Sequence, residues 1–165
     1  MRLIATLFLV LLAALPTATA DAPLAAPDLI VVEKANRVLT LYAKRKAIKT
    51  YRIALGGNPV GHKEQEGDSR TPEGRYIIDA KNPWSSFHLS LHISYPDRRD
   101  RAAARKKGVS PGGAIMIHGT PDGLASLHAL VVINDWTAGC IAVTNAEIEE
   151  IYRVVRIGTP IVIKP

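Results

Sequence analysis

Short runs of β-branched and aromatic residues, separated by brief turn signals, constrain the fold of this chain more than any other feature. The runs lie at 29–34 (LIVVEK), 37–43 (RVLTLYA) and 47–56 (AIKTYRIALG). Their partial alternation of apolar and polar residues is typical of strands with one buried face. The breaks between them are short enough for tight turns. The pattern therefore predicts three antiparallel strands in succession.

The same pattern returns later in the chain, together with two helical segments. Strands are predicted at 75–80 (RYIIDA), 87–94 (FHLSLHIS), 114–119 (AIMIHG) and 159–165 (TPIVIKP). Residues 97–107 predict a solvated surface helix that ends at Gly108. Residues 146–155 predict an amphipathic helix capped by Asn145. The expected fold is therefore mostly β (α+β), with a few short helices.

The N-terminus has the layout of an export signal. Arg2 precedes an apolar run from Leu3 to Leu15, and small residues follow at Ala18, Thr19 and Ala20. An uncleaved anchor is the alternative, but the run is shorter than the roughly 20 residues that a bilayer span needs. We expect a signal peptide at 1–20, a spacer at 21–28 and one domain at 29–165. The mature protein is expected in the periplasm or cell envelope, without stable membrane insertion.

The charge balance narrows the choice of partners. The chain has 21 Lys and Arg residues against 15 Asp and Glu residues, a formal net charge of +6. A basic exported protein suits an anionic partner such as the cell wall, although the charge can equally serve solubility. Nucleic acid is not expected as a partner in that compartment.

Cys140 is the only cysteine, so it cannot form an internal disulfide. Exported compartments are usually oxidising, so a lone thiol there is either buried and inert or kept for its reactivity. Gly139 permits a backbone conformation in which neighbouring amides point at one spot, as in an oxyanion hole. A nucleophilic thiol also needs an imidazole to take its proton. His118, which ends a predicted strand before Gly119, is the candidate base, whereas His128 is expected to be structural.

Several segments resemble the L,D-transpeptidases of the YkuD domain family. The family motif is a histidine-glycine followed, after a spacer, by [ST]-H-G-C, and it is matched by His118-Gly119 and by the stretch from Thr137 to Cys140. The segments GDSRTPEGRY, PGG before IMIHG, DWTAGCIAVTN and GTPIVI extend the likeness over most of the mature chain. The resemblance implies a YkuD-like β-sandwich of mixed sheets, with a catalytic cleft in which the cysteine loop faces the histidine strand.

The resemblance also implies a reaction. Members of the family attack the carbonyl of the third residue of a peptidoglycan stem peptide, expel D-alanine and form a thioester that an amine or water resolves. Carried over residue by residue, Cys140 is the nucleophile, His118 is the base and the Gly119 carbonyl orients His118. The amides of Gly139 and Cys140 hold the oxyanion, with Thr137 beside them. The expected partners are stem peptides, with a wall-attached protein as a further possible substrate, and no cofactor is expected.

Two alanines depart from the family motif. Ala138 stands where the family usually has a histidine, and Ala142 where it has an asparagine or arginine. The resulting T-x-G-C-x-A-x-T pattern resembles a branch that includes enzymes hydrolysing a wall linkage. Three functions are therefore open: a transpeptidase, a hydrolase (L,D-carboxypeptidase or amidase) with the same thioester chemistry, and a wall-binding module without turnover. Asp135 is a rival to Gly119 for orienting the histidine, because of its charge and its nearness in sequence.

The remaining candidates are weaker. Arg70 and Thr71, in the GDSRTPEG loop, could meet a substrate carboxylate, although glycine, proline and charge also make an ordinary turn. His88 and His92 share one face of a predicted strand and could be drawn with the candidate base and nucleophile as a metal site. No metal-binding spacing supports such a site, so no metal is expected.

Overall fold

The computed structural model describes residues 24–121 and 133–165. In chain order the elements are β1 (Leu29–Glu33), β2 (Val38–Ala43), β3 (Lys46–Arg52), β4 (Gly74–Ser85), β5 (His88–Ile93), α1 (Arg98–Lys107), β6 (Met116–His118), β7 (Ile141–Ala142), α3 (Asn145–Val154) and β8 (Pro160–Lys164). The predicted signal peptide at 1–20, residues 21–23 of the spacer and His128 lie outside the described residues.

The eight strands join one mixed sheet in the order β3-β2-β1-β8-β4-β5-β6-β7. β1 pairs with β8 and β6 pairs with β7 in parallel, whereas the other neighbours are antiparallel. The long strand β4 links the two halves of the sheet, because its first residues pair with β8 and its later residues pair with β5. The prediction of a mostly β fold with mixed strand directions and a few short helices is confirmed.

The hairpin between β2 and β3 shows how the sequence pattern becomes structure. Leu39 and Leu41 are fully buried on one face of β2. Lys44 and Arg45 connect the strands with φ angles of 50° and 67°. Two consecutive positive φ angles are the conformation of a two-residue hairpin turn, whose twist matches that of the flanking strands. The predicted turn and both strands are therefore present.

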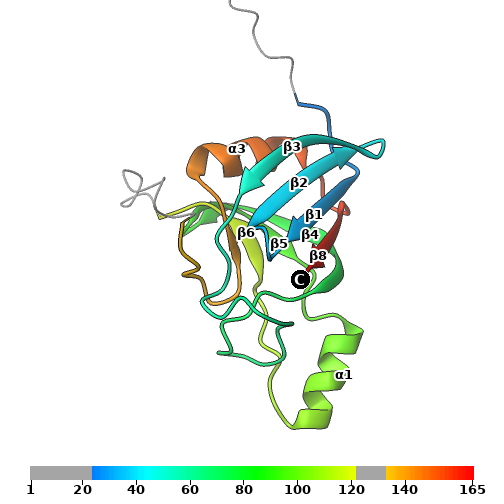
Figure 1. The fold of residues 1–165 in the computed structure, drawn as a ribbon, viewed down its shortest axis with the longest axis vertical. Coiled ribbons are helices and arrows are strands. Elements are labelled where there is room, and N and C mark those ends of the chain that lie inside the picture. Colours follow the sequence, from blue (N-terminus) through cyan, green and yellow to red (C-terminus); the bar gives the residue numbers. More distant parts are fainter. Residues whose placement is uncertain (1–23, 122–132) are drawn as a thin grey trace, which may run out of the picture.

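Helix α1 is the predicted surface helix. The Asp97 side chain caps it by accepting hydrogen bonds from the backbone of Arg99 and Asp100, and it ends at Gly108 in the left-handed conformation. Ala104 is its only buried residue. In Figure 1, α1 projects from the body at the end of the molecule opposite to α3.

Helix α3 begins one residue earlier than its predicted cap implies. The N-cap is Thr144, whose hydroxyl accepts from the Glu147 N–H while the Glu147 carboxylate accepts from the Thr144 N–H. The expectation that Asn145 caps this helix is therefore wrong, because a threonine one residue earlier completes a capping box. Ile148 and Ile151 bury the apolar face of α3 against β5 and β6.

The core consists mainly of isoleucine, leucine and valine side chains from both halves of the sheet and from α3. The packing of α3 fixes β5 and β6, and therefore the place where β6 ends at His118. Among the residues that the structure describes, no helix is both long and apolar enough to cross a membrane.

Candidate functional site

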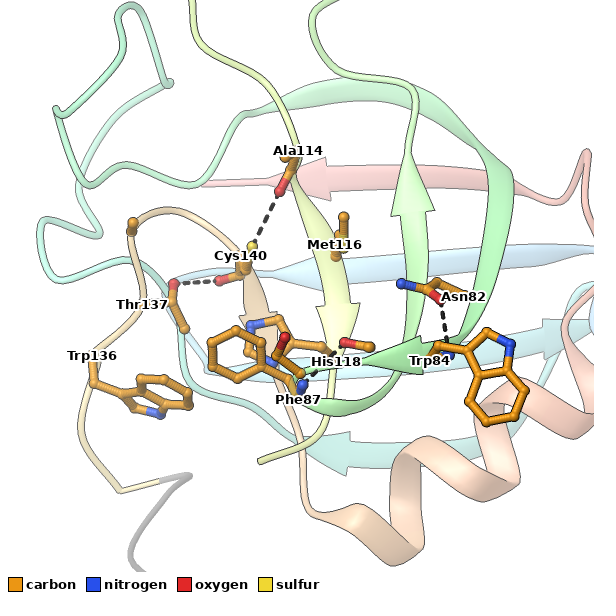
Figure 2. Close-up of a pocket in the computed structure, with 12 residues that line it drawn as sticks. Asn82, Trp84, Phe87, Ala114, Met116, His118, Trp136, Thr137 and Cys140 are labelled. Carbon is orange, nitrogen blue, oxygen red and sulfur yellow. Dashed lines mark hydrogen bonds between the residues drawn. The ribbon is translucent and has the colours of Figure 1, made fainter. Parts of the chain in front are cut away.

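The pairing of β6 with β7 brings together two residues that lie far apart in sequence. Ile117 is opposite Ile141 and His118 is opposite Ala142 in this parallel pair. Because side chains alternate between faces along a strand, His118 and Cys140 point to the same side. Both side chains line one cavity, as Figure 2 shows.

This cavity has a volume of about 550 Å³. Its lining comes from the β4–β5 hairpin, from β6 and the segment before it, and from the loop that carries the cysteine. The lining residues are Asn82, Trp84, Ser85, Ser86, Phe87, Ala114, Met116, His118, Trp136, Thr137, Ala138 and Cys140.

The His118 ring is buried, and a main-chain carbonyl holds its orientation. Nδ1 lies 2.6 Å from the Gly119 oxygen, and since a carbonyl only accepts, Nδ1 carries the proton and donates it. Nε2 is then the nitrogen that can accept a proton. The rings of Phe87 and Trp136 pack on the imidazole, with centroids 4.5 and 5.8 Å away. Burial lowers the pKa of His118, and the bond to Gly119 opposes part of this effect.

Gly119 is required here by close packing on its Cα. A Cβ at this position would lie 2.4 Å from Asn145 Oδ1 and 3.1 Å from the Phe87 carbonyl oxygen. The Asn145 oxygen is itself held by hydrogen bonds from the N–H and the hydroxyl of Thr120. The Gly119 N–H donates to the carbonyls of Phe87 and Leu89. These contacts fix the position of the Gly119 carbonyl, which accepts the hydrogen bond from His118 Nδ1.

Cys140 is partly buried, immediately before β7. Its Sγ lies 3.5 Å from the Ala114 carbonyl oxygen. Burial raises the pKa of the Cys140 thiol, while a hydrogen bond from the Met116 backbone and the charge of Lys63 act in the opposite direction. Because the thiol pKa is raised and the imidazole pKa is lowered, both groups are neutral at rest near pH 7.

Thr137 ties the cysteine loop together. Its hydroxyl donates to the Cys140 carbonyl at 2.8 Å and accepts from the Gly139 N–H at 3.1 Å. The Gly139 N–H is therefore engaged inside the loop in this state. An oxyanion hole formed by the amides of Gly139 and Cys140 stays a prediction.

Gly139 and Gly56 allow three backbone segments to meet behind the cysteine. Gly139 has a φ of 130°. A Cβ on it would lie 2.5 Å from the Arg70 carbonyl oxygen, and one on Gly56 would lie 2.1 Å from the Ser69 carbonyl oxygen. Any side chain at either position would push the GDSRTPEG loop away from the cysteine loop.

That loop is organised by Asp68 and not by Arg70. The Asp68 carboxylate accepts from the backbone N–H groups of Glu64, Gln65 and Arg70 and from the buried Lys63 ammonium. These partners lower the pKa of Asp68 to about 2, against the opposing effect of its burial. The Arg70 guanidinium lies 3.5 Å from the His62 carbonyl oxygen and is not part of the cavity lining.

Thr71 likewise contributes to the packing of this loop. It is fully buried, and its hydroxyl accepts from the Gly56 N–H at 3.1 Å. Its carbonyl oxygen accepts from the buried Lys34 ammonium at 3.0 Å. The structure therefore places both loop candidates, Arg70 and Thr71, behind the cysteine loop and not beside the sulfur.

The Asp135 carboxylate is held on the other side of the cysteine loop. It accepts from Nε and Nη2 of Arg37 and from the Leu55 N–H at 2.9 Å. The structure thus does not bring Asp135 to the His118 ring, whose Nδ1 bonds to Gly119 instead. Asp135 anchors the loop to the turn between β1 and β2 and to the segment that follows β3.

His88 and His92 each pair with a carboxylate outside the cavity lining. His88 Nε2 lies 2.8 Å from Glu149 Oε1, and His92 Nδ1 lies 2.5 Å from Asp79 Oδ1. Within residues 24–121 and 133–165, no group of three His, Cys, Asp or Glu side chains is arranged to hold a metal ion.

Sequence reasoning missed the aromatic walls of the cavity. Trp84, Phe87 and Trp136 all line it. The signal that could have indicated Trp84 is its place in the polar turn NPWSS, where an apolar core residue is not expected.

Comparisons with known proteins agree with this geometry. The L,D-transpeptidase catalytic domain family, YkuD, matches residues 27–163. YafK of Escherichia coli K12, to which an L,D-transpeptidase activity is provisionally assigned, is 29% identical over 135 residues, which is 78% of this chain and 47% of YafK. The chain thus spans about half the length of the curated relatives that it matches.

Solved structures share the fold. A variant of Pgp2, a helical cell shape determining protein from Campylobacter jejuni, superposes with a TM-score of 0.67 at 25% identity, over 86% of this chain and 48% of Pgp2. An L,D-transpeptidase from Mycobacterium smegmatis superposes with a TM-score of 0.57 at 15% identity, over 85% of this chain and 59% of that enzyme, a likeness of fold alone. Because the family match covers most of the chain, this protein belongs to the YkuD family of L,D-transpeptidase catalytic domains.

Proposed function

We propose that the chain is an exported L,D-transpeptidase that acts on peptidoglycan stem tetrapeptides through a thioester at Cys140 and transfers the acyl group to an amine. The observation that carries this proposal is the shared cavity of Cys140 and His118, in which Nδ1 donates to the Gly119 carbonyl and Nε2 is the nitrogen that can accept a proton. An imidazole held in this tautomer is suited to act as a general base.

In the first half of the reaction, Nε2 of His118 takes the thiol proton while Sγ attacks the carbonyl carbon of the third stem residue. The tetrahedral intermediate collapses, the carbon–nitrogen bond to D-alanine breaks, and the leaving amine takes the proton from His118. A thioester at Cys140 remains. An acceptor amine then attacks it, His118 removes the amine proton, and the thiol leaves with that proton.

The resting pair is neutral, so the proton transfer accompanies the attack. A thiol with a raised pKa and an imidazole with a lowered pKa do not form a stable ion pair before substrate binds. Stabilisation of the oxyanion therefore matters, at about 3–4 kcal/mol per amide donor. For the Gly139 N–H to contribute, it would exchange its bond to the Thr137 hydroxyl for one to the oxyanion.

Hydrolysis of the thioester is the second candidate, and the two alanines of the motif favour it. Ala138 lines the cavity with a methyl group, and Ala142 is fully buried beside β6. Neither side chain can orient an acceptor amine by hydrogen bonding. Water would then resolve the thioester, and the enzyme would shorten a stem or release a wall-attached protein.

Incubation with disaccharide tetrapeptides, with and without an acceptor amine, followed by mass analysis, tests these functions. Cross-linked products support transfer, and shortened stems in the presence of the amine support hydrolysis. The Cys140→Ala variant should abolish either reaction. Unchanged substrate, together with no acyl adduct on Cys140, would refute both.

A further inference from the structure

The β4–β5 hairpin holds a tryptophan in solvent at the rim of the cavity. Trp84 is 90% exposed, although it is one of only two tryptophans in the chain. Single exposed apolar side chains are common on protein surfaces, but Trp84 also lines the cavity, and ligand pockets are commonly lined by aromatic side chains. Trp84 is therefore placed to contact a ligand that enters the cavity.

Hydrogen bonds within the β4–β5 hairpin fix the exposed position of Trp84. Register shifts between Asn82 and Ser85, and the Trp84 N–H donates to Asn82 Oδ1 at 2.9 Å inside this bulge. The Phe87 N–H donates to the Ser85 hydroxyl at 3.1 Å. Two side-chain to backbone bonds thus set the hairpin tip and present the indole outward.

The surroundings of Trp84 are polar but uncharged. Its neighbours in the lining are Asn82, Ser85 and Ser86, and the described lining contains no Asp, Glu, Lys or Arg. Asn82 and Ser86 are both exposed, so their polar groups are accessible to a ligand. An aromatic face beside neutral donors and acceptors suits a sugar ring, which has an apolar CH face and hydroxyl groups around its edge.

The dimensions of the cavity connect this rim to the nucleophile. Figure 2 shows Trp84 and Cys140 on opposite sides of the cavity. A sphere of its volume, about 550 Å³, is about 10 Å across, which is the span of about three extended residues. If Cys140 attacks the third stem residue, the first residue, which carries the glycan, lies near the rim.

We propose that Trp84, with Asn82 and Ser86, forms a subsite for a neutral sugar ring of the glycan strand to which the stem peptide is attached. The subsite rests on the proposed function for its substrate, and it adds the recognition of the glycan to that of the peptide.

Two measurements test the subsite. The first compares kcat/KM for a disaccharide tetrapeptide and for the free tetrapeptide. Trp84→Ala should lower the ratio of kcat/KM for the disaccharide tetrapeptide to kcat/KM for the free tetrapeptide at least tenfold. Trp84→Phe, which keeps an aromatic face, should lower this ratio less. Val60→Ala, which removes a comparably exposed apolar side chain away from the cavity, should leave the ratio unchanged.

The second measurement does not depend on turnover. In Cys140→Ala protein, the peptide-free disaccharide should shift the indole N–H resonance that Trp84→Phe removes, and it should shift the other indole less. An unchanged kcat/KM ratio, equal losses on both substrates, or no resonance shift would overturn the subsite. If the native chain turns over neither substrate, the proposed function fails, and the resonance titration alone decides whether the sugar binds.

Discussion

The backbone contact behind Cys140 predicts a large effect from a single methyl group at Gly139. A Cβ there would lie 2.5 Å from the Arg70 carbonyl oxygen and 3.2 Å from Ile115 Cδ1, on a residue whose φ is 130°. Adopting that φ costs a side-chain-bearing residue about 1–3 kcal/mol, and relieving the overlap costs about 1–3 kcal/mol more. Gly139→Ala should therefore lower the free energy of unfolding by about 2–6 kcal/mol, a large share of the total for a small domain.

Gly57 supplies the matched control. It lies in the segment that contacts the cysteine loop, but a Cβ on it would meet only the Asp135 carbonyl oxygen, at 3.8 Å. Gly57→Ala should change stability by less than about 0.5 kcal/mol, as expected for substitutions that meet no close contact.

Urea unfolding and the initial rate of tetrapeptide consumption measure the two consequences. Gly139→Ala should also slow the reaction by at least about 100-fold, because a shift of about 1 Å in a reacting group has an effect of that size. If Gly139→Ala unfolds at the same urea concentration as the native chain and keeps its rate, the loop relaxes freely and the packing argument is wrong. Equal losses in Gly57→Ala would show that the effect does not come from this contact.

Further predictions concern charges around the site. Asp135→Ala should lower the free energy of unfolding in urea by about 2–4 kcal/mol, because it removes an ion pair and leaves the Leu55 N–H unpaired. Asp135→Asn should lower it less. A shift in the pH profile of the reaction without a loss of stability would contradict this prediction. The acid limb of kcat/KM should have its midpoint below pH 6.5, because the reaction needs neutral His118 and burial lowers its pKa; a midpoint above 6.5 would count against His118 as the base. Iodoacetamide should alkylate Cys140 more slowly at pH 7 than it alkylates a free cysteine peptide, because burial raises the thiol pKa. Lys34→Met should cost about 3–5 kcal/mol, since it leaves a carboxylate and two carbonyls of the adjoining loop without their buried donor.

Local pattern was sufficient to predict most strands but not their ends. The strand predicted at 75–80 continues to Ser85, although Pro83 normally ends a strand assignment. Pro83 is tolerated because it falls in the register shift between Asn82 and Ser85. The two-residue strand β7 (Ile141–Ala142) is too short to give a periodic signal, and it forms through its pairing with β6 and the bridge between Ala142 and Ala54.

The sequence likewise indicated some residues of the site and not others. The family motif predicted that His118 and Cys140 belong together, and the structure places both in one cavity, while their catalytic roles stay a prediction. Asp135 was suggested by its nearness to the cysteine in sequence, but its ion-pair partner Arg37 is 98 positions away. No local pattern could indicate that contact. Trp84 was missed for a related reason, since its place beside the cavity depends on how the β4–β5 hairpin folds.

The cysteine loop is held by its backbone and by residues outside the motif, and this bears on the two halves of the proposed reaction. Gly139 packs on the Arg70 carbonyl. The Thr137 hydroxyl bonds to the Gly139 N–H and to the Cys140 carbonyl. Asp135 fixes the start of the loop through its bond from the Leu55 N–H. None of these contacts uses the side chain of residue 138, which faces the cavity. An alanine at 138 can therefore remove a group that would act on an acceptor without displacing Sγ. On the proposed mechanism, the geometry for forming the thioester and the choice between amine and water as its acceptor can vary independently in this fold.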